Sequence, residues 1–463
     1  MMNGEKSLGV TVHPMTKEID KGAIIFQKVF LCQRIEDYLI PQHHIMYKML
    51  KRYIGYFQTP KPERVERRIL ELIKHAYKHV PFYYDLMKAH GLTPDEFNSF
   101  EDYLEKFPRT PTTEYRAIQQ EKGIKYMMDD RIEPESLIEI RSSGSSGIPF
   151  SIYKTRGEKA IDSAKTVWHL TQGGLRPWHR VLAVVDPMNV VKRDSILQEF
   201  GIFRRSFGNS MMEPDDIMDI IGEKKINAVY GQKSMIMLIA NHYNKTNRKP
   251  PHLSFLMPGA ELITRADREI LKRTFLPTRY GEFYGSTETG IIATKNSGDY
   301  KVNFHSTFFC LSAPETSEDL TRGTITVTSQ DLEVQPILMV GLGDVVTVRN
   351  YEHLLELKTS IVSIDGRDND YLVLENGERL SGMTLLAVLI KPLFILKFRI
   401  VQDCIGSCRV LLRLREETEA NKREVESLLE SVLAGKIRYK IEYVDDIPID
   451  PNEKTKVIVS KIS

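Results

Sequence analysis

The chain contains few of the residues that would stabilise a disulfide-rich or membrane-embedded fold. Among 463 residues there are four cysteines and two tryptophans, and the longest apolar run, Leu385–Ile390, is far shorter than a bilayer span. The cysteine spacings fit neither a zinc site nor a redox pair, so we expect buried or free thiols in a reducing cytosol. A formal net charge of +2 gives no reason to expect nucleic acid or an anionic membrane as the main partner.

The length and the start of the chain limit its organisation. A chain of 463 residues exceeds what one hydrophobic core usually serves, so two or three domains are expected. The N-terminus has no apolar signal-peptide segment, which predicts a cytoplasmic protein without a membrane span.

Two segments carry most of the chemical information. The first, Ser142-Ser-Gly-Ser-Ser-Gly-Ile-Pro149, combines hydroxyls with glycines, which suits a loop that wraps phosphates, although a flexible linker has the same composition. The second, Tyr284-Gly-Ser-Thr-Glu-Thr-Gly290, supplies an aromatic ring, hydroxyls and a carboxylate. Together they favour a nucleotide site over a linker.

Strand and helix patterns alternate between these segments and beyond them. This alternation predicts an α/β fold, a large domain with parallel or mixed sheets covered by helices, whose ligands bind at the carboxyl ends of the strands. Strands are expected at 181–185, 226–230, 253–257 and 279–284, and helices at 63–80, 233–243 and 265–275.

The pattern changes after Tyr300 to short β segments and then to a small α+β unit. Gly and polar residues at Asp365-Gly-Arg-Asp-Asn369 mark the boundary. The predicted domains are an N-terminal extension at 1–58, a large domain for ATP and an acid at 59–365, and a mobile C-terminal domain at 366–463.

The order of these motifs resembles that of the adenylate-forming enzymes, the acyl-CoA synthetase-like superfamily. The Ser/Gly loop, Tyr284–Glu288, Gly343-Asp344, Gly366-Arg367 and a C-terminal lysine are most similar to the phenylacetate–CoA ligase and capsule-biosynthesis ligase group. That resemblance implies activation of a carboxylic acid with Mg-ATP to an acyl-adenylate, followed by transfer of the acyl group. The acceptor is a thiol, of coenzyme A or a carrier protein, or an amine.

The resemblance also implies roles for individual residues. Thr287 would donate to the α-phosphate, Glu288 would ligate Mg²⁺, and Lys454 would bridge the carboxylate and the α-phosphate. The residues implied to bind the nucleotide are Ser142, Ser143, Gly144, Ser145, Ser146, Gly147, Gly259, Ala260, Glu261, Tyr284, Gly285, Ser286, Asp344 and Arg367.

Four departures from the family pattern leave alternatives open. Met339 stands where a basic residue is usual, Asn369 where the hinge often has aspartate, and Glu453 where a glycine precedes the catalytic lysine. Lys456 is therefore an alternative to Lys454. The segment after the hinge, 370–378, is acidic rather than basic and Gly-rich, which puts coenzyme A as acceptor in question. A catalytically degenerate nucleotide-binding relative, acting as a binding or partner protein, is the alternative function.

The first residues resemble a different enzyme. Residues 9–39 are similar to a fragment of a formyltransferase domain, in which His13 and Asp20 match that family's late His and catalytic Asp. The rest of a formyl-transfer site has no counterpart, so we predict no formyl transfer and interpret the segment as a remnant or an N-terminal extension.

Overall fold

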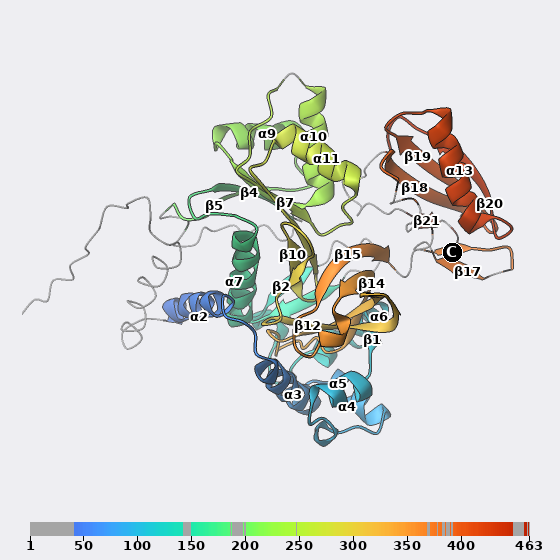
Figure 1. Ribbon diagram of the computed structural model, residues 1–463. Helices are drawn as coiled ribbons and strands as arrows, with labels where there is room; N and C mark the ends of the chain where they lie inside the picture. Colours follow the sequence, from blue (N-terminus) through green and yellow to red (C-terminus); the bar gives the residue numbers. More distant parts are fainter. Residues whose placement is uncertain are drawn as a thin grey trace, which may run out of the picture.

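The computed structural model describes most of the chain after residue 40 (Figure 1). The described residues are 41–141, 150–185, 187, 198, 201–246, 248–367, 371–376, 378–381, 385, 389, 392–447, 458–460 and 462. Outside them lie the formyltransferase-like segment, the Ser142–Pro149 loop, Asn369, Lys454 and Lys456.

The N-terminal part of the described chain is helical. The period of Val65, Ile69, Leu72 and Ala76 buries one face of α3, and Pro81 begins the next helix because proline suits the first helical position. The elements are α2 (Pro41–Gly55), α3 (Pro62–His79), α4 (Pro81–Ala89), η1 (Pro94–Glu96), α5 (Phe100–Lys106), α6 (Thr112–Lys122), η2 (Ile124–Met127) and η3 (Pro134–Ser136).

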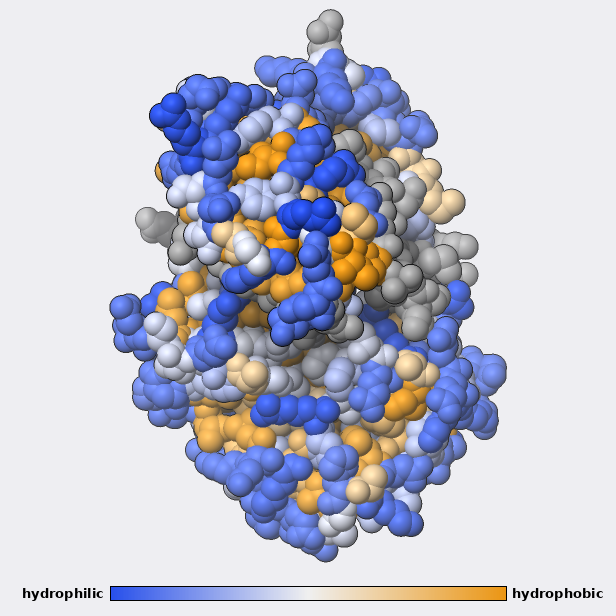
Figure 2. All heavy atoms as spheres, turned by 90° about the vertical axis from the view of Figure 1, so that its right-hand side faces the viewer, coloured by the Kyte–Doolittle hydropathy of each residue, from blue (hydrophilic) through white to orange (hydrophobic). Residues whose placement is uncertain are grey.

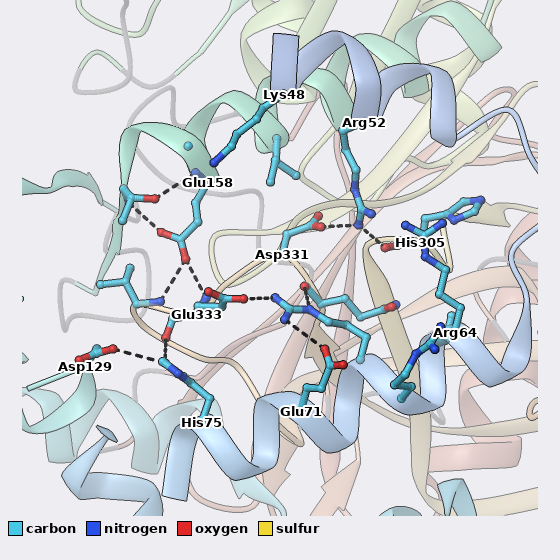
Figure 3. Close-up of a pocket in the computed structure, with 18 of the residues that line it drawn as sticks. Lys48, Arg52, Arg64, Glu71, His75, Asp129, Glu158, His305, Asp331 and Glu333 are labelled. Carbon is cyan, nitrogen blue, oxygen red and sulfur yellow. Dashed lines mark hydrogen bonds and ion pairs between the residues drawn. The ribbon is translucent and has the colours of Figure 1, made fainter. Parts of the chain in front are cut away.

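The helix α2 packs against the large α/β part of the chain. Arg52 forms a 2.6 Å ion pair with Asp331 (Figure 3). Tyr53 bonds to Thr171 on α7 (Arg156–Gln172), and the Tyr56 hydroxyl lies 2.8 Å from that of Ser306. Residues 41–55 are thus fixed to the large part, whereas an N-terminal unit at 1–58 stays a prediction.

An eight-stranded sheet forms the centre of the large part. Its order is β11-β10-β9-β7-β6-β4-β5, with β8 beside β7; the strands from β5 to β9 run parallel and β10 is antiparallel to β9. The strands are β4 (Arg180–Val184), β5 (Arg204–Gly208), β6 (Ala228–Gln232), β7 (Phe255–Gly259), β8 (Arg279–Tyr280), β9 (Glu282–Ser286), β10 (Gly290–Lys295) and β11 (Lys301–Val302).

Helices cover both faces of this sheet because its strands are apolar on both sides. Leu182 and Leu256 pack against the first face's helices, α9 (Pro214–Glu223), α10 (Lys233–Lys245) and α11 (Arg265–Phe275). Their neighbours Val181 and Phe255 pack on the other face with Leu170 of α7 (Arg156–Gln172). The predicted alternation of strands and helices is confirmed.

The second sheet of the large part has longer strands than the sequence predicted. Its order is β1-β14-β13-β12, with β15 paired to β14. The strands are β1 (Thr110–Pro111), β12 (Thr307–Ser317), β13 (Leu320–Ser329), β14 (Val340–Arg349) and β15 (Ser360–Arg367), and η5 (Tyr351–His353) precedes the last. The short β segments expected after Tyr300 are parts of longer strands, since β13 and β14 each span ten residues. Register shifts and glycines interrupt the apolar pattern of both strands.

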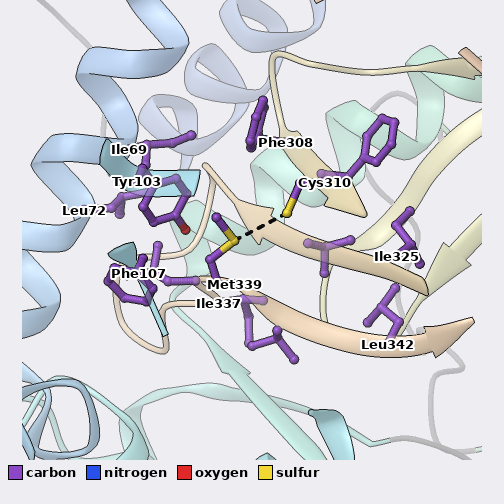
Figure 4. Close-up of a cluster of buried hydrophobic side chains, with 14 of the residues drawn as sticks. Ile69, Leu72, Tyr103, Phe107, Phe308, Cys310, Ile325, Ile337, Met339 and Leu342 are labelled. Carbon is purple, nitrogen blue, oxygen red and sulfur yellow. Dashed lines mark hydrogen bonds between the residues drawn. The ribbon is translucent and has the colours of Figure 1, made fainter. Parts of the chain in front are cut away.

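The main hydrophobic core lies between this sheet and the N-terminal helices (Figure 4). Met339, at the position where the family usually has a basic residue, is completely buried there, and its sulfur lies 3.7 Å from the Cys310 thiol. Its backbone is left-handed, with φ 49°. An apolar side chain at 339 therefore belongs to the core, and this position supplies no cation.

The C-terminal residues form a smaller α+β unit with its own buried cluster. Its main sheet has the order β20-β19-β18-β21, and Arg415 reaches Glu269 on α11 at 2.7 Å. The elements are β16 (Tyr371–Val373), β17 (Arg379–Ser381), β18 (Ile395–Cys404), β19 (Ser407–Leu414), α13 (Glu419–Leu433), β20 (Arg438–Tyr443) and β21 (Ile458–Ser460). The α/β fold class with a small C-terminal unit is confirmed; the domain boundaries themselves stay predictions.

The side that carries the C-terminal unit is mostly hydrophilic, with apolar side chains in separate groups (Figure 2). Within the described residues, no helix combines the length and the apolar character needed to cross a bilayer. Trp178 is 64% exposed, so this tryptophan does not belong to a hydrophobic core.

The same substitution at a buried and an exposed methionine tests the core. Met339→Lys would place an unpaired ammonium in the core and is expected to lower the free energy of unfolding by at least about 3 kcal/mol. Met211→Lys, at a position 83% exposed, is the control and should change it by less than about 0.5 kcal/mol. Urea denaturation of both variants measures the difference; equal stabilities would place Met339 at the surface.

Candidate functional site

Three residues predicted from separate motifs meet where the two sheets of the large part approach each other. Tyr284 on β9 is buried, and its hydroxyl donates a 2.8 Å hydrogen bond to Asp344 Oδ2 on β14. Arg367, at the end of β15, places Nε 3.3 Å from Asp344 Oδ1. Asp344 and Arg367 are direct partners in the antiparallel register of β14 and β15.

The electrostatics of this cluster keep Tyr284 protonated. Burial, together with the Asp344 carboxylate, raises the pKa of the Tyr284 phenol well above its usual value of 10.0. The hydroxyl therefore acts as a donor to Asp344. Arg367, by contrast, has a side chain 42% exposed, so its guanidinium can reach a ligand as well as Asp344.

Glu288 lies in the turn between β9 and β10, close to this cluster in sequence. Its carboxylate is 3% exposed and accepts bonds at Oε1 from Thr112 Oγ1, at 2.8 Å, and Arg116 Nη2, at 3.2 Å. Burial alone would raise the pKa of Glu288, but the Arg116 charge and these hydrogen bonds outweigh it, and the pKa lies below 4.5. Glu288 is therefore a carboxylate at neutral pH.

The ends of the Ser/Gly loop connect to the same place. The strands β2 (Ile138–Arg141) and β3 (Ser151–Lys154) pair antiparallel, with Arg141 opposite Ser151, and residues 142–149 join them. Phe150, the residue after the loop, lies under the Arg116 guanidinium, 5.2 Å from ring centroid to Cζ. The C-terminal end of the loop, at Phe150, therefore contacts Arg116, the residue that pairs with Glu288.

Comparison with solved structures identifies the fold. The chain superposes on 2-hydroxyisobutyryl-CoA ligase in the postadenylation state in complex with R3-HIB-AMP, with a TM-score of 0.65, 16% identity, and coverage of 86% of this chain and 89% of that one. The open conformation of that ligase in complex with 2-HIB-AMP and CoA gives a TM-score of 0.59 at 15% identity. This match covers 86% of this chain and 91% of that one. The chain has the fold of the adenylate-forming ligases.

A second comparison concerns the C-terminal residues of this adenylate-forming fold. Residues 372–461 match a family model described as the CapK C-terminal domain. Comparison of the sequence with curated proteins gave no significant match. The expected similarity to acyl-CoA ligases and to capsule-biosynthesis ligases is confirmed.

The end of β7 and the loop after it carry three more residues that are predicted to contact the nucleotide. Gly259 pairs with Phe283 of β9, and a Cβ at Gly259 would lie 2.5 Å from the Phe283 ring, so only glycine fits. Ala260 is exposed and left-handed, with φ 64°. The Glu261 carboxylate is 1% exposed and accepts a 2.7 Å bond from Ser234 Oγ on α10, so its side chain anchors this loop to α10. Its contact with a nucleotide stays a prediction.

Other predicted residues lie beside the cluster or outside the described chain. Gly285, Ser286 and Thr287 are partly buried in β9 and the turn after it, and the Ser286 hydroxyl lies 3.2 Å from that of Thr289. Lys454 and Lys456 lie outside the described residues, two to four positions before β21, which pairs in parallel with β18.

Sequence patterns did not reveal the residues that hold Glu288. Thr112 and Arg116 come from α6, more than 170 positions earlier, and belong to no motif. Thr112 and Arg116 stand four positions apart and so lie on one face of α6. This spacing alone only weakly indicates that both could bind one carboxylate. Lys165 of α7, which is fully buried and donates to the Thr289 carbonyl, gave no signal either.

The Glu288–Arg116 pair predicts a defined response to acid. Because the folded-state pKa of Glu288 lies below 4.5, the charged pair stabilises the protein above that pH, and the contribution is lost as the pH falls through the folded-state pKa. Glu288→Gln is expected to lower the free energy of unfolding by about 3 kcal/mol at neutral pH, with a difference from wild type that shrinks below about pH 4.5.

Urea denaturation across this pH range measures the effect. Glu114→Gln, an exposed acid on the same helix as Arg116, is the matched control and should show no such pH dependence. A Glu288→Gln difference that stays constant down to acidic pH would contradict the pairing.

Proposed function

We propose that this protein is an ATP-dependent, AMP-forming carboxylate ligase. The observation that carries the proposal is the convergence of Tyr284, Asp344 and Arg367 between the two sheets, with Glu288 in the adjoining turn. A partly buried carboxylate held in place by a phenol and a guanidinium suits a ribose diol, which donates hydrogen bonds. An arginine that is still partly exposed suits a phosphate or ribose oxygen.

The side chains also fit a metal–triphosphate. The Glu288 carboxylate, which accepts hydrogen bonds from Thr112 and Arg116 at Oε1, would hold Mg²⁺. Such a hard cation takes one carboxylate and completes its coordination with phosphates and water. When bound, Mg²⁺ would neutralise charge on the phosphates. Arg116 keeps Glu288 ionised and oriented.

The remaining roles belong to the loop and the lysine. Ser142, Ser143, Ser145, Ser146 and the backbone of Gly144 and Gly147 would hold the β- and γ-phosphates, and Thr287 would donate to the α-phosphate. Lys454 would hold the substrate carboxylate against phosphorus. A carboxylate oxygen then attacks the α-phosphorus, the bond to the pyrophosphate oxygen breaks, and acyl-adenylate and pyrophosphate result.

The second step passes the acyl group to an acceptor. A thiol or amine attacks the acyl carbon, the bond to the AMP oxygen breaks, and the acceptor loses one proton. Coenzyme A, a carrier-protein thiol and an amine are all compatible acceptors. Between β16 and β17 the turn presents Glu375, which pairs with Arg438 at 3.1 Å, rather than a basic segment. This acidic turn favours an acceptor that needs no phosphate-binding loop at this position.

Pyrophosphate exchange tests the first step and the lysine assignment. With a panel of aryl and short-chain acids, the wild type should exchange labelled pyrophosphate into ATP, and Lys454→Ala should abolish exchange while leaving transfer from supplied acyl-adenylate largely intact. Lys456→Ala is the matched control; if it alone abolishes exchange, Lys456 is the catalytic lysine. No exchange with any acid, with ATP still bound in calorimetry, would favour the degenerate nucleotide-binding relative.

Asp344→Asn tests the ribose contact. The variant keeps the shape and the bond from Tyr284 but loses the charge that accepts from the diol, so the KM for ATP should rise about tenfold or more. Asp365→Asn is the control on the neighbouring strand, where that carboxylate bonds to Thr347 at 2.7 Å and Arg322 at 3.3 Å. Equal ATP affinities in the Asp344 and Asp365 variants would contradict the assignment.

A further inference from the structure

A cavity of about 660 Å³ lies apart from the Tyr284–Asp344 cluster, between α2, α3 and the segment 330–334. Figure 3 shows Lys48 and Arg52 projecting from α2 on one side, while Arg64, Glu71 and His75 come from α3 on the other. A volume of this size is in the usual range for small-molecule sites. Nothing in the proposed ligase reaction uses it.

The lining is rich in cations, with seven lysines and arginines against five acids. The acids are mostly occupied. Asp331 pairs with Arg52 at 2.6 Å, Glu333 with Arg68 at 2.7 Å, and Asp129 with Arg131 at 2.6 Å.

Glu158, the fourth acid, is satisfied by backbone groups. Oε1 accepts from the N–H groups of Glu333 and Val334, and Oε2 from that of Thr155. Only Glu71 is loosely held, 3.9 Å from Arg68. The acids of the lining therefore have little capacity left to neutralise further cations.

Four cations remain for a ligand. Across the described part of the chain, Lys48, Lys61, Arg64 and Arg67 form no ion pair, and all four are exposed at the cavity. Arg64 and Arg67 stand three positions apart on α3, so both guanidinium groups lie on one side of the helix. In addition, Thr155 and Gly157 bring the positive N-terminal end of the 17-residue helix α7 into the wall.

We propose that this cavity binds a small molecule that carries two or more phosphates. Several unpaired cations, two of them guanidinium groups that match phosphate oxygens in geometry, select a multiply charged anion over a monoanion. Because the acids of the cavity are already paired, such a ligand is recognised by Lys48 on α2 and by Lys61, Arg64 and Arg67 at the start of α3.

Inorganic tripolyphosphate is the probe, and hydrogen exchange with mass spectrometry locates it. In the full-length wild-type protein, tripolyphosphate should protect the first half of α3 and the first turn of α7. AMP, with one phosphate, should protect them much less at the same concentration. Arg64→Gln combined with Arg67→Gln should weaken tripolyphosphate binding about tenfold or more and remove this protection.

The control removes the same charge from the same helix. Lys74→Gln combined with Lys78→Gln lies on α3 outside the cavity lining and should leave the protection unchanged. Protection confined to the Tyr284–Asp344 cluster, or equal loss in both double variants, would overturn the proposal. So would a single-stranded oligonucleotide that protects α3 more strongly than tripolyphosphate, because it would assign these cations to nucleic acid. None of these measurements depends on ligase activity.

Discussion

The hydrogen bond from Tyr284 to Asp344 joins the two sheets of the large part of the molecule, and the candidate site depends on it. Tyr284 belongs to β9 of the eight-stranded sheet, and Asp344 belongs to β14 of the second sheet. Burial and the carboxylate charge keep the phenol protonated, so the bond has a fixed direction. Since β15 pairs with β14 and Arg367 lies opposite Asp344, the same bond also positions Arg367 relative to Tyr284. Side chains from three motifs that are far apart in sequence thereby contact one another in the candidate site.

The order of the motifs along the chain predicted that these residues belong to one site. In the structure Arg367 ends β15 and Glu288 lies in a turn, whereas Tyr284 and Asp344 lie within β9 and β14. The parallel strands were predictable from their apolar runs, and the sheet edge follows from their shared direction. Thr112, Arg116 and Lys165 could not be predicted, because they reach the site from helices whose packing depends on tertiary contacts. Strand lengths in the second sheet were underestimated, since local composition does not show how far pairing continues through a glycine or a bulge.

Buried charges on α7 connect the candidate site with the cavity between α2 and α3. Lys165 Nζ donates to the Thr289 carbonyl, beside Glu288, and lies 3.9 Å from both Asp331 and Asp162. Asp162 also pairs with Lys154 at 3.2 Å, and although burial opposes its charge, these lysines hold the pKa of Asp162 far below its usual value. Because each charge is buried with a partner, α7 has little freedom to shift without breaking several pairs. The helix therefore gives the candidate site and the basic cavity a common rigid support.

The position of Arg367 limits how the C-terminal unit can be placed. Only residues 368–370 separate Arg367, which contacts Asp344, from Tyr371 at the start of β16. Four consecutive Cα–Cα steps span at most about 15 Å, whatever conformation these residues adopt. The C-terminal unit is in effect tethered beside Asp344, the residue proposed to contact ribose. A rearrangement of that unit is thus a rotation about a nearly fixed point in the candidate site.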